Sequence, residues 1–481
     1  MTITRRTLLR SSLVAGATLA GAGGKAAAQP GSAAPPAQDP APPHQHGAPP
    51  AQDPAPPHQH GAPPAPPPHQ HGAPPAQQPP PPTTLPVAPP TLGRGTLPGS
   101  RVAVPNGAVL PWTARGGVKI FHLRAEPLRH QIAPGLDVEA WGYNGLSPGP
   151  VIEAVAGDHV RIYVTNRLPE PTSIHWHGIL VPYGMDGVTG LTQPAIEPGK
   201  TFRYEFTFDR AGTFMYHPHA DEMTQIALGM MGMIVVHPRA PAPRRTRDYA
   251  LMAHEWKIPI GTRRADPLAM NDFNVLTFNG KAFPATAPMV AEIGDVIRIR
   301  FGNLGPMDHH PLHLHGHTFE LVGTDGGAVP ASARLPETTV LVPTGTTRTI
   351  EFVARAAGDW PLHCHMTHHA MNQMGHDAAN LIGARTDGLD AGLGRAAPGA
   401  MVMGAGGMGD MSRMAMAKPS PSIAMLGGDG PHGMIDMGGM FTLIKIRDRL
   451  TGDGDPGWYK PTSGAASEAT PDELARDGIT E

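Results

Sequence analysis

The heptapeptide His-Cys-His-Met-Thr-His-His spans residues 363–369 and contains Cys364, the only cysteine of the 481-residue chain. A thiolate binds copper through sulfur, and imidazoles bind it through nitrogen. In a His-Cys-His tripeptide the sulfur can therefore hold one metal ion while each flanking ring holds a different one. Electrons that enter at the sulfur-bound metal then reach its neighbours through a few covalent bonds. This position of the single thiol indicates a metal centre.

Three further clusters space their histidines as imidazole pairs. They are His175-Trp176-His177-Gly178, His217-Pro218-His219, and residues 310–317, which read His-Pro-Leu-His-Leu-His-Gly-His. One His-x-His motif is weak evidence by itself, because a histidine on a strand usually has a structural role. Four clusters together, one of which holds the sole cysteine, predict a set of metal sites.

The four motifs resemble the copper signatures of the multicopper oxidases, a family that includes laccases and cuprous oxidases. The resemblance covers roughly residues 100–450, and the His-Cys-His segment is its most specific part. His369 follows Cys364 by five residues and Met374 follows it by ten, which is the family's type 1 copper spacing. Two histidines and a cysteine with a long methionine bond form a blue-copper electron-transfer site.

The resemblance implies four coppers and a ligand set for each. Type 1 copper would be held by His310, Cys364, His369 and Met374, type 2 by His175 and His313, one type 3 by His177, His217 and His365, and the other type 3 by His219, His315 and His363. Eight imidazoles for three coppers leave open positions for oxygen and water, as a catalytic site needs.

Some neighbouring residues compete for these roles. His368 could replace His369, and Met371 could replace Met374, but neither has the family spacing. Asp186 matches an acidic residue that the family places near the trinuclear cluster for proton delivery. The alternative is an ordinary turn at Asp186-Gly187. Cuprous oxidases often have an acid directly after the second type 1 histidine, but Ala370 stands there in this chain.

The part of the chain that carries the motifs is duplicated. Residues 157–166, GDHVRIYVTN, parallel residues 294–303, GDVIRIRFGN, and each copy is followed by a His-x-His-Gly motif. Each copy later reaches a glycine-led strand that ends in paired histidines, at His217 and His363. The type 1 ligands of the second copy map onto Thr172, Pro218, Met223 and Leu228 in the first. The first repeat therefore has no type 1 copper.

Short runs rich in β-branched and aromatic residues, bounded by Gly, Pro and Asn, predict strands. They lie at 160–164, 202–208, 234–236, 296–301, 319–322, 349–353 and 441–446. Many such strands indicate an all-β sandwich or barrel. Together with the resemblance, they predict two Greek-key cupredoxin domains at 100–240 and 245–450. The second would contain a Met-rich insertion at about 385–440, and a flexible tail would follow at 451–481.

Only 90 residues, 220–309, separate His219 from His310, which leaves no room for the middle domain of three-domain family members. The chain therefore resembles a two-domain member. In such members the trinuclear cluster forms between the first domain of one chain and the second domain of the next. The resemblance thus implies a homotrimer.

The N-terminus predicts export. Arg5-Arg6 precedes a short apolar run, and Ala26-Ala27-Ala28 supplies a cleavage site, which together look like a twin-arginine signal at 1–28. This predicts a periplasmic or secreted protein with no membrane span. Residues 29–99 are rich in proline with repeated His-Gln-His units, so we expect a disordered segment that is either an inert linker or a weak copper-gathering arm.

The formal net charge of −3 gives no sign of nucleic-acid binding. The family resemblance implies an O2-reducing oxidase that takes electrons from Cu(I) or from phenolic donors, with Mn(II) a lesser option. Ten methionines at 401–440 favour Cu(I), because thioether sulfur selects that ion and a glycine-rich loop cannot pack them all as core. A copper-sequestering protein without turnover is the alternative function.

Overall fold

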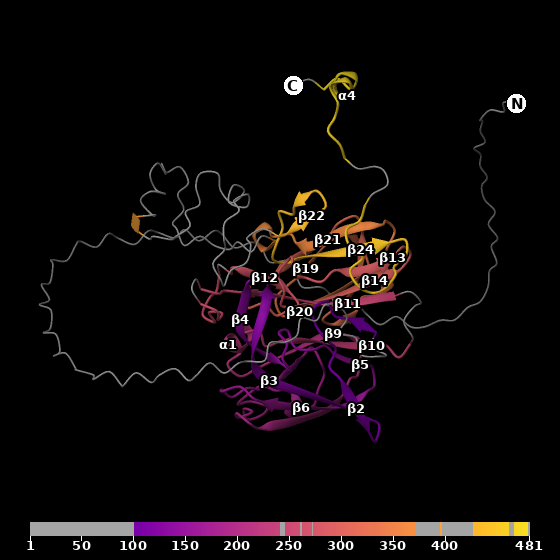
Figure 1. Cartoon of the computed structure of the whole chain (residues 1–481). Helices are drawn as coiled ribbons and strands as arrows, with labels where there is room; N and C mark the ends of the chain where they lie inside the picture. Colours follow the sequence, from indigo (N-terminus) through magenta and orange to yellow (C-terminus); the bar gives the residue numbers. More distant parts are fainter. Residues whose placement is uncertain are drawn as a thin grey trace, which may run out of the picture. The chain divides into compact units, whose positions relative to one another are not determined.

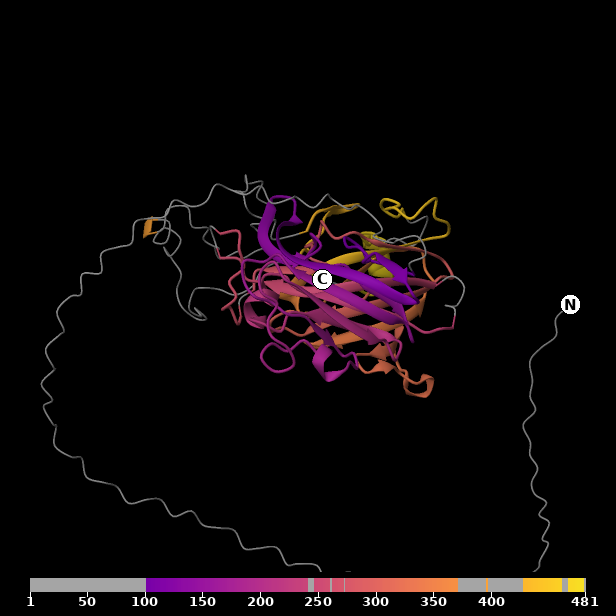
Figure 2. The same ribbon diagram turned by 90° about the horizontal axis from the view of Figure 1, so that it is seen from below.

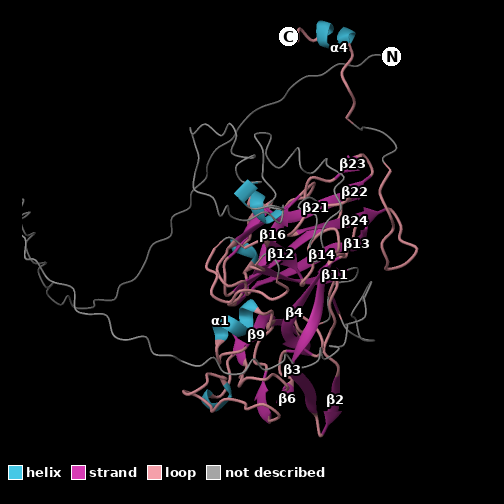
Figure 3. Ribbon diagram, turned by 60° about the vertical axis from the view of Figure 1, so that its left-hand side comes forward, coloured by secondary structure: helices cyan, strands magenta, loops and turns pink. Residues whose placement is uncertain are grey.

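The computed structural model describes residues 101–240, 246–259, 262–271, 273–370, 395–396, 427–460 and 466–479. The predicted export signal, the Pro/His-rich segment, Met374 and most of the Met-rich insertion lie outside these residues. The chain is all-β, as predicted, and its few helices are short (Figures 1 and 3). None of the described helices is long and apolar enough to cross a membrane.

The first domain is a sandwich of two sheets. One sheet has the order β2 (Trp112–Arg115), β3 (Val118–Ala133), β6 (His159–Asn166), β8 (Thr201–Thr207), with β4 (Leu136–Tyr143) paired to β3. The other has the order β5 (Ile152–Val155), β10 (Gly232–His237), β9 (Gly212–His217), β7 (His175–His177). The 3-10 helix η1 (Tyr183–Met185) and the helix α1 (Glu222–Ala227) lie in its connections.

The second domain is also a two-sheet sandwich. One sheet has the order β1 (Val102–Ala103), β11 (Thr246–Trp256), β14 (Val296–Asn303), β20 (Thr346–Val353), β16 (Phe319–Thr324), β17 (Gly327–Ala328), with β12 (Val275–Phe278) on β11 and β18 (Pro336–Glu337) on β16. The other has the order β13 (Met289–Glu292), β24 (Phe441–Arg447), β21 (Gly358–Cys364), β15 (His310–Leu314), β19 (Thr339–Val342). The remaining elements are η2 (Ala331–Ala333), η3 (Thr367–Ala370), the small pair β22 (Asp429–Gly430) and β23 (Gly433–Met434), and α4 (Pro471–Arg476).

Each of the seven predicted strand segments falls on a strand, with Phe208 one residue past the end of β8, and several of these strands alternate between buried and less buried residues. In β6, for example, Val160, Ile162 and Val164 are fully buried while the residues between them are not. Every residue of β10 is buried, and so is every residue of β24 except Arg447. In β10 this has a clear cause. Both of its faces are covered: Ile234 belongs to the first-domain core, and Val235 belongs, with Ala250 of β11, to a core shared by the two domains. Figure 2 shows the indigo-to-magenta strands of the first domain in front of the orange strands of the second.

The strand register repeats between the domains. In the first domain, His175 of β7 faces His217 of β9. In the second, His313 of β15 faces His363 of β21. The glycine after each His-x-His motif has a positive φ, 82° at Gly178 and 71° at Gly316, a backbone conformation that favours glycine. The duplication in the sequence is therefore a duplication of backbone geometry around the histidines.

Candidate metal centres

Three predicted ligands of the second domain converge in the core. Cys364 ends β21, His310 begins the neighbouring strand β15, and His369 lies on η3. The Cys364 sulfur is 3.8 Å from Nδ1 of His310 and 3.5 Å from Nδ1 of His369, and these two nitrogens are 3.2 Å apart. All three side chains are at most 1% exposed. We call this group the buried trio; His368, the competing histidine, is exposed.

The hydrogen-bond partners of the trio test whether it fits a metal. Nε2 of His310 lies 3.3 Å from a carboxylate oxygen of Glu255, so this nitrogen carries the proton and donates it. Nδ1 of His310 then presents a lone pair toward the Cys364 sulfur and toward His369. Without a metal the thiol proton can satisfy one of these lone pairs, and with the proton removed the sulfur and the nitrogens converge on one point in a dry core, as the donors of a metal site do. The donor set of one thiolate and two imidazoles suits copper.

The thiol is held protonated in the absence of metal. Burial raises the pKa of Cys364 to about 12, and the nearby carboxylates of Asp308 and Glu255 add to the effect. Because the thiolate is the form that binds a metal, metal binding at this site must displace a proton. The buried trio is therefore closed to ordinary thiol chemistry at neutral pH and suited to a metal.

Glu255 supports the trio, and the sequence motifs do not reveal it. Its side chain is fully buried on β11 and also accepts hydrogen bonds from the backbone N–H groups of Met307 (2.8 Å) and Asp308 (2.9 Å). Burial acts to raise the pKa of this carboxyl, but hydrogen bonding and proximity to His310 outweigh burial, and the pKa is lowered. The available signal was a charged residue within the apolar run 250–256.

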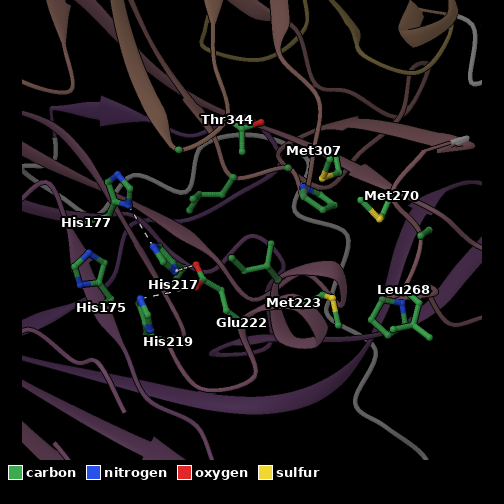
Figure 4. Close-up of a pocket in the computed structure, with 17 residues that line it drawn as sticks. His175, His177, His217, His219, Glu222, Met223, Leu268, Met270, Met307 and Thr344 are labelled. Atoms are coloured by element: carbon green, nitrogen blue, oxygen red, sulfur yellow. Dashed lines mark hydrogen bonds and ion pairs between the residues drawn. The ribbon is translucent and has the colours of Figure 1, made fainter. Parts of the chain in front are cut away.

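Four histidines of the first domain form a second cluster, the first-domain set: His175, His177, His217 and His219. Nδ1 of His177 lies 3.2 Å from Nε2 of His217, and Nδ1 of His175 donates to the carbonyl of Asp186 at 2.8 Å. The set opens into a cavity of about 730 Å³ that Met223, Met270 and Met307 also line (Figure 4).

Four histidines of the second domain repeat that arrangement and form the second-domain set: His313, His315, His363 and His365. Nε2 of His315 lies 3.1 Å from Nε2 of His363, and Nδ1 of His313 donates to the carbonyl of Thr338 at 2.8 Å. In both domains the last strand histidine donates Nδ1–H to a neighbouring carbonyl at 2.9 Å, from His217 to Pro218 and from His363 to Cys364. Each of these rings therefore turns its Nε2 lone pair toward its cluster.

The two sets are separate within one chain. Ring contacts join members within each set, with centroids 4.8–6.3 Å apart. Among the described residues, no ring contact or hydrogen bond joins a member of one set to a member of the other. Each set thus holds half of the eight imidazoles that the sequence predicts for three coppers.

In four of these rings burial favours the neutral form, which is the metal-binding form of histidine. It lowers the pKa of His217 to about 3 and also lowers the pKa of His177, His315 and His363. Neighbouring histidines lower these values further. Protons therefore do not compete with a metal at these nitrogens near neutral pH.

Of the remaining predicted residues, some lie beside the histidines and others lie outside the described part of the chain. Asp186 ends η1, and its carboxylate lies 3.5 Å from Nδ1 of His175. Met374 and Met371 lie outside the described residues. Of the ten methionines at 401–440, Met440 is fully buried in the second-domain core with Cys364, so this one has a structural role in packing.

Comparisons with known proteins agree with this geometry. Two family models described as multicopper oxidase match residues 126–241 and 259–382. Copper resistance protein A of Escherichia coli is 42% identical over 123 residues, which is 25% of this chain and 20% of that protein. Laccase-1 of Cryptococcus neoformans var. grubii is 30% identical over 225 residues, 40% of this chain and 36% of that protein. These matches span well under half of either curated relative.

A solved structure matches over a larger share. The crystal structure of a blue copper oxidase from Nitrosomonas europaea has a TM-score of 0.52 and 26% sequence identity. The match covers 75% of this chain and 94% of that one. The two Greek-key sandwiches are thus cupredoxin domains, as the sequence predicted.

Proposed function

This chain belongs to the multicopper oxidase family, and from that premise we propose that it oxidises a donor one electron at a time and reduces O2 to water with four electrons. Bound copper would supply the one-electron redox chemistry and the reduction of O2. The observation that carries the proposal is the position of Cys364. It belongs to the buried trio, and its two peptide neighbours, His363 and His365, belong to the second-domain set. The backbone itself links the donor-facing site to the oxygen-facing site.

Each histidine group has a proposed role. The buried trio, with Met374 as axial ligand, would hold type 1 copper. His175 and His313 would hold type 2 copper, and the other six histidines would hold the type 3 pair. Asp186 would deliver a proton through its carboxylate, which lies beside the ring of His175. The tautomers support these roles, because each ring with a backbone acceptor at Nδ1 keeps Nε2 free.

We also propose that the oxygen site forms between two chains, in a homotrimer. The support is that each chain carries two half-sets of four histidines with no contact between them among the described residues. A head-to-tail contact would join the first-domain set of one chain to the second-domain set of the next, and a closed ring would complete every site.

A mixing experiment tests the shared site. His217→Ala disables the first-domain set, and His363→Ala disables the second-domain set, so each variant alone is expected to be inactive. When both are expressed together, every mixed ring contains one junction in which both half-sets are intact. Activity should therefore return in the mixture. Two self-sufficient monomeric sites would give no recovery, and a 50.6 kDa monomer with full activity would refute the trimer outright.

The donor remains a choice between Cu(I) and phenols. The names of the curated relatives, a copper resistance protein and a laccase, favour one donor each. Deletion of residues 401–426, which removes seven of the ten methionines and spares β22 to β24, separates the two. If Cu(I) oxidation survives this deletion at full rate, the methionines are not the Cu(I) capture site.

The twin-arginine motif supports export to the periplasm or beyond, and a reporter fused to residues 1–28 would test it.

The decisive measurement is copper content together with visible and EPR spectra and O2 uptake. We expect about four coppers per chain by the family ligand count, an intense thiolate absorption, and O2 consumption with a reducing donor. A protein that binds copper but lacks the thiolate band and consumes no O2 would instead be a copper-sequestering protein.

A further inference from the structure

Glu222 lies against two histidines of the first-domain set. It is the first residue of α1, three residues after His219, and it lines the same cavity. One carboxylate oxygen is 3.2 Å from Nδ1 of His217, and the other is 3.8 Å from Nε2 of His219 (Figure 4). A single side chain thus faces both the histidine that ends β9 and the histidine two residues beyond it.

The contact with His217 determines which nitrogen carries the proton. Nδ1 of His217 faces two oxygens, the Pro218 carbonyl at 2.9 Å and the Glu222 carboxylate. A carbonyl and a carboxylate only accept hydrogen bonds, so Nδ1 is the donor. The lone pair of the neutral ring is then on Nε2, which points toward His177 at 3.2 Å and so into the set. A carboxylate in this position orients a metal-binding ring and raises its basicity.

The backbone around Glu222 is anchored. Asp221 has a φ of 43°, a left-handed conformation that is uncommon for a residue other than glycine. Gln225, one turn along α1, is fully buried and donates through its amide nitrogen to the carbonyl of Pro171 at 2.9 Å. His219 is tied to the same segment, because its backbone N–H donates to the Ser173 hydroxyl at 3.0 Å. The start of α1 and the histidines are therefore held in one frame.

The second domain lacks this carboxylate. Position 368 stands five residues after His363, as position 222 stands five residues after His217, and it is a histidine. Within the described part of the chain, no ion pair joins an acidic side chain to His363 or His365. Eight neutral imidazoles would give three copper ions no negative charge. Among the ion pairs of the described residues, Glu222 beside His217 and Asp186 beside His175 bring negative charge to the histidines, and both belong to the first domain.

From these contacts we propose that Glu222 is a positioning residue for copper at the first-domain set, one that holds His217 in its metal-binding orientation and lies against His219. The inference rests on the proposed function, because it takes copper as the metal. Removal of a carboxylate that supports a metal-binding histidine typically weakens metal affinity about 10–100-fold. Loss of Glu222 should therefore release copper from the histidine sites and leave the buried trio unaffected.

The test compares Glu222→Ala, Glu222→Gln and Met223→Ala in the full-length, copper-loaded protein. Met223 is the matched control, since it is the next residue of α1, is 59% exposed and lines the same cavity. Each protein is titrated with a Cu(II) chelator, and the copper that remains is counted while the thiolate absorption reports the buried trio. We expect Glu222→Ala to lose histidine-bound copper at about 10–100-fold lower chelator concentration than the wild type. Glu222→Gln, which keeps an oxygen acceptor for Nδ1 of His217, should lose it at an intermediate concentration.

Three outcomes are informative. Retention in Glu222→Ala equal to that in Met223→Ala overturns the inference. Equal release from all three variants also overturns it, because any change at the start of α1 would then be sufficient. Absence of the thiolate absorption in the wild type overturns the proposed function instead, and the inference with it. The isosteric glutamine variant keeps the test valid if the alanine variant fails to fold.

Discussion

The two cupredoxin domains share a strand register but fill it with different chemistry. Where the second domain places His310, Cys364 and His369, the aligned positions of the first domain are Thr172, Pro218 and Met223. The Thr172 hydroxyl is buried and lies 2.6 Å from the side-chain oxygen of Gln225, to which it donates. In the first domain a neutral hydrogen bond thus occupies the place that the buried trio occupies in the second.

This difference shows which features the shared backbone determines and which it does not. The backbone sets the facing pairs His175 with His217 and His313 with His363, and both domains keep those pairs. It does not determine which side chains occupy the positions of the buried trio and the aligned positions of the first domain. A buried thiol with two imidazoles needs a charged partner such as Glu255, whereas a Thr–Gln pair satisfies itself. The predictions below change one member of this comparison at a time.

The largest effect is expected for Cys364→Ser. Serine offers no thiolate, so the buried trio should lose its copper and its visible absorption, and donor oxidation should fall to background. The first-domain set should keep its copper. The aligned change in the first domain, Pro218→Ala, retains the carbonyl that accepts from His217 and should leave the visible spectrum unchanged. A thiolate absorption that survives Cys364→Ser would contradict the assignment of the trio.

The second-largest effect is expected for Glu255→Ala. It leaves the backbone N–H groups of Met307 and Asp308, and Nε2–H of His310, without their buried acceptor. A buried donor left without its acceptor typically costs about 1–3 kcal/mol of unfolding free energy, and this change leaves three such donors. Denaturant unfolding of the copper-free protein measures this. Glu255→Gln should cost less, because it keeps an acceptor, and Glu320→Ala, at an exposed glutamate, should cost almost nothing. Equal losses in all three variants would show that Glu255 has no special role.

The sequence predicts much of this molecule, and its omissions have physical reasons. Strand positions follow from alternation, and the histidine groups follow from spacing along one strand or turn. Glu255 is 55 residues before His310, so only the pairing of β11 with β14 and the turn into β15 brings the two together. Glu222 was closer to detection, since it lies three residues after His219. The left-handed conformation of Asp221, which turns Glu222 toward the histidines, has no sequence signature.

Acid should lower the free energy of unfolding of the protein, and this loss limits any comparison of the two domains at low pH. Burial, with Lys281 nearby, lowers the pKa of His130 to about 4, and burial also lowers the pKa of His254 to about 4. In the unfolded chain each of these histidines has an ordinary pKa near 6.5. Between pH 6.5 and 4 the unfolded chain therefore binds more protons than the folded protein does. Stability is therefore complete above pH 6.5 and falls as pH drops toward 4, by up to about 3 kcal/mol for each ring.

Thermal unfolding of the copper-free protein from pH 7.5 to 4 measures this dependence. His130→Gln should reduce the slope in that window by about one proton's worth, or roughly 1.4 kcal/mol per pH unit. His122→Gln, at an exposed histidine, is the control and should change the slope much less. A slope that His130→Gln leaves intact would contradict the assignment of this acid sensitivity to His130 and would point instead to His254 or to the histidine sets.

The smallest loss of unfolding free energy is expected for a change at Thr172, the position of the first domain that aligns with His310. Thr172→Val keeps the shape of the side chain but removes its hydroxyl, which leaves the buried oxygen of Gln225 without this donor. A buried acceptor left unpaired costs about 1–3 kcal/mol. Copper content should not change, because Thr172 holds no metal, and the Gln225 amide still donates to Pro171. Chemical unfolding of the copper-free protein, with copper counted separately, checks both statements. Loss of copper in Thr172→Val would mean that the Thr–Gln pair supports the first-domain set as Glu255 supports the buried trio, and the two domains would then differ less than their side chains suggest.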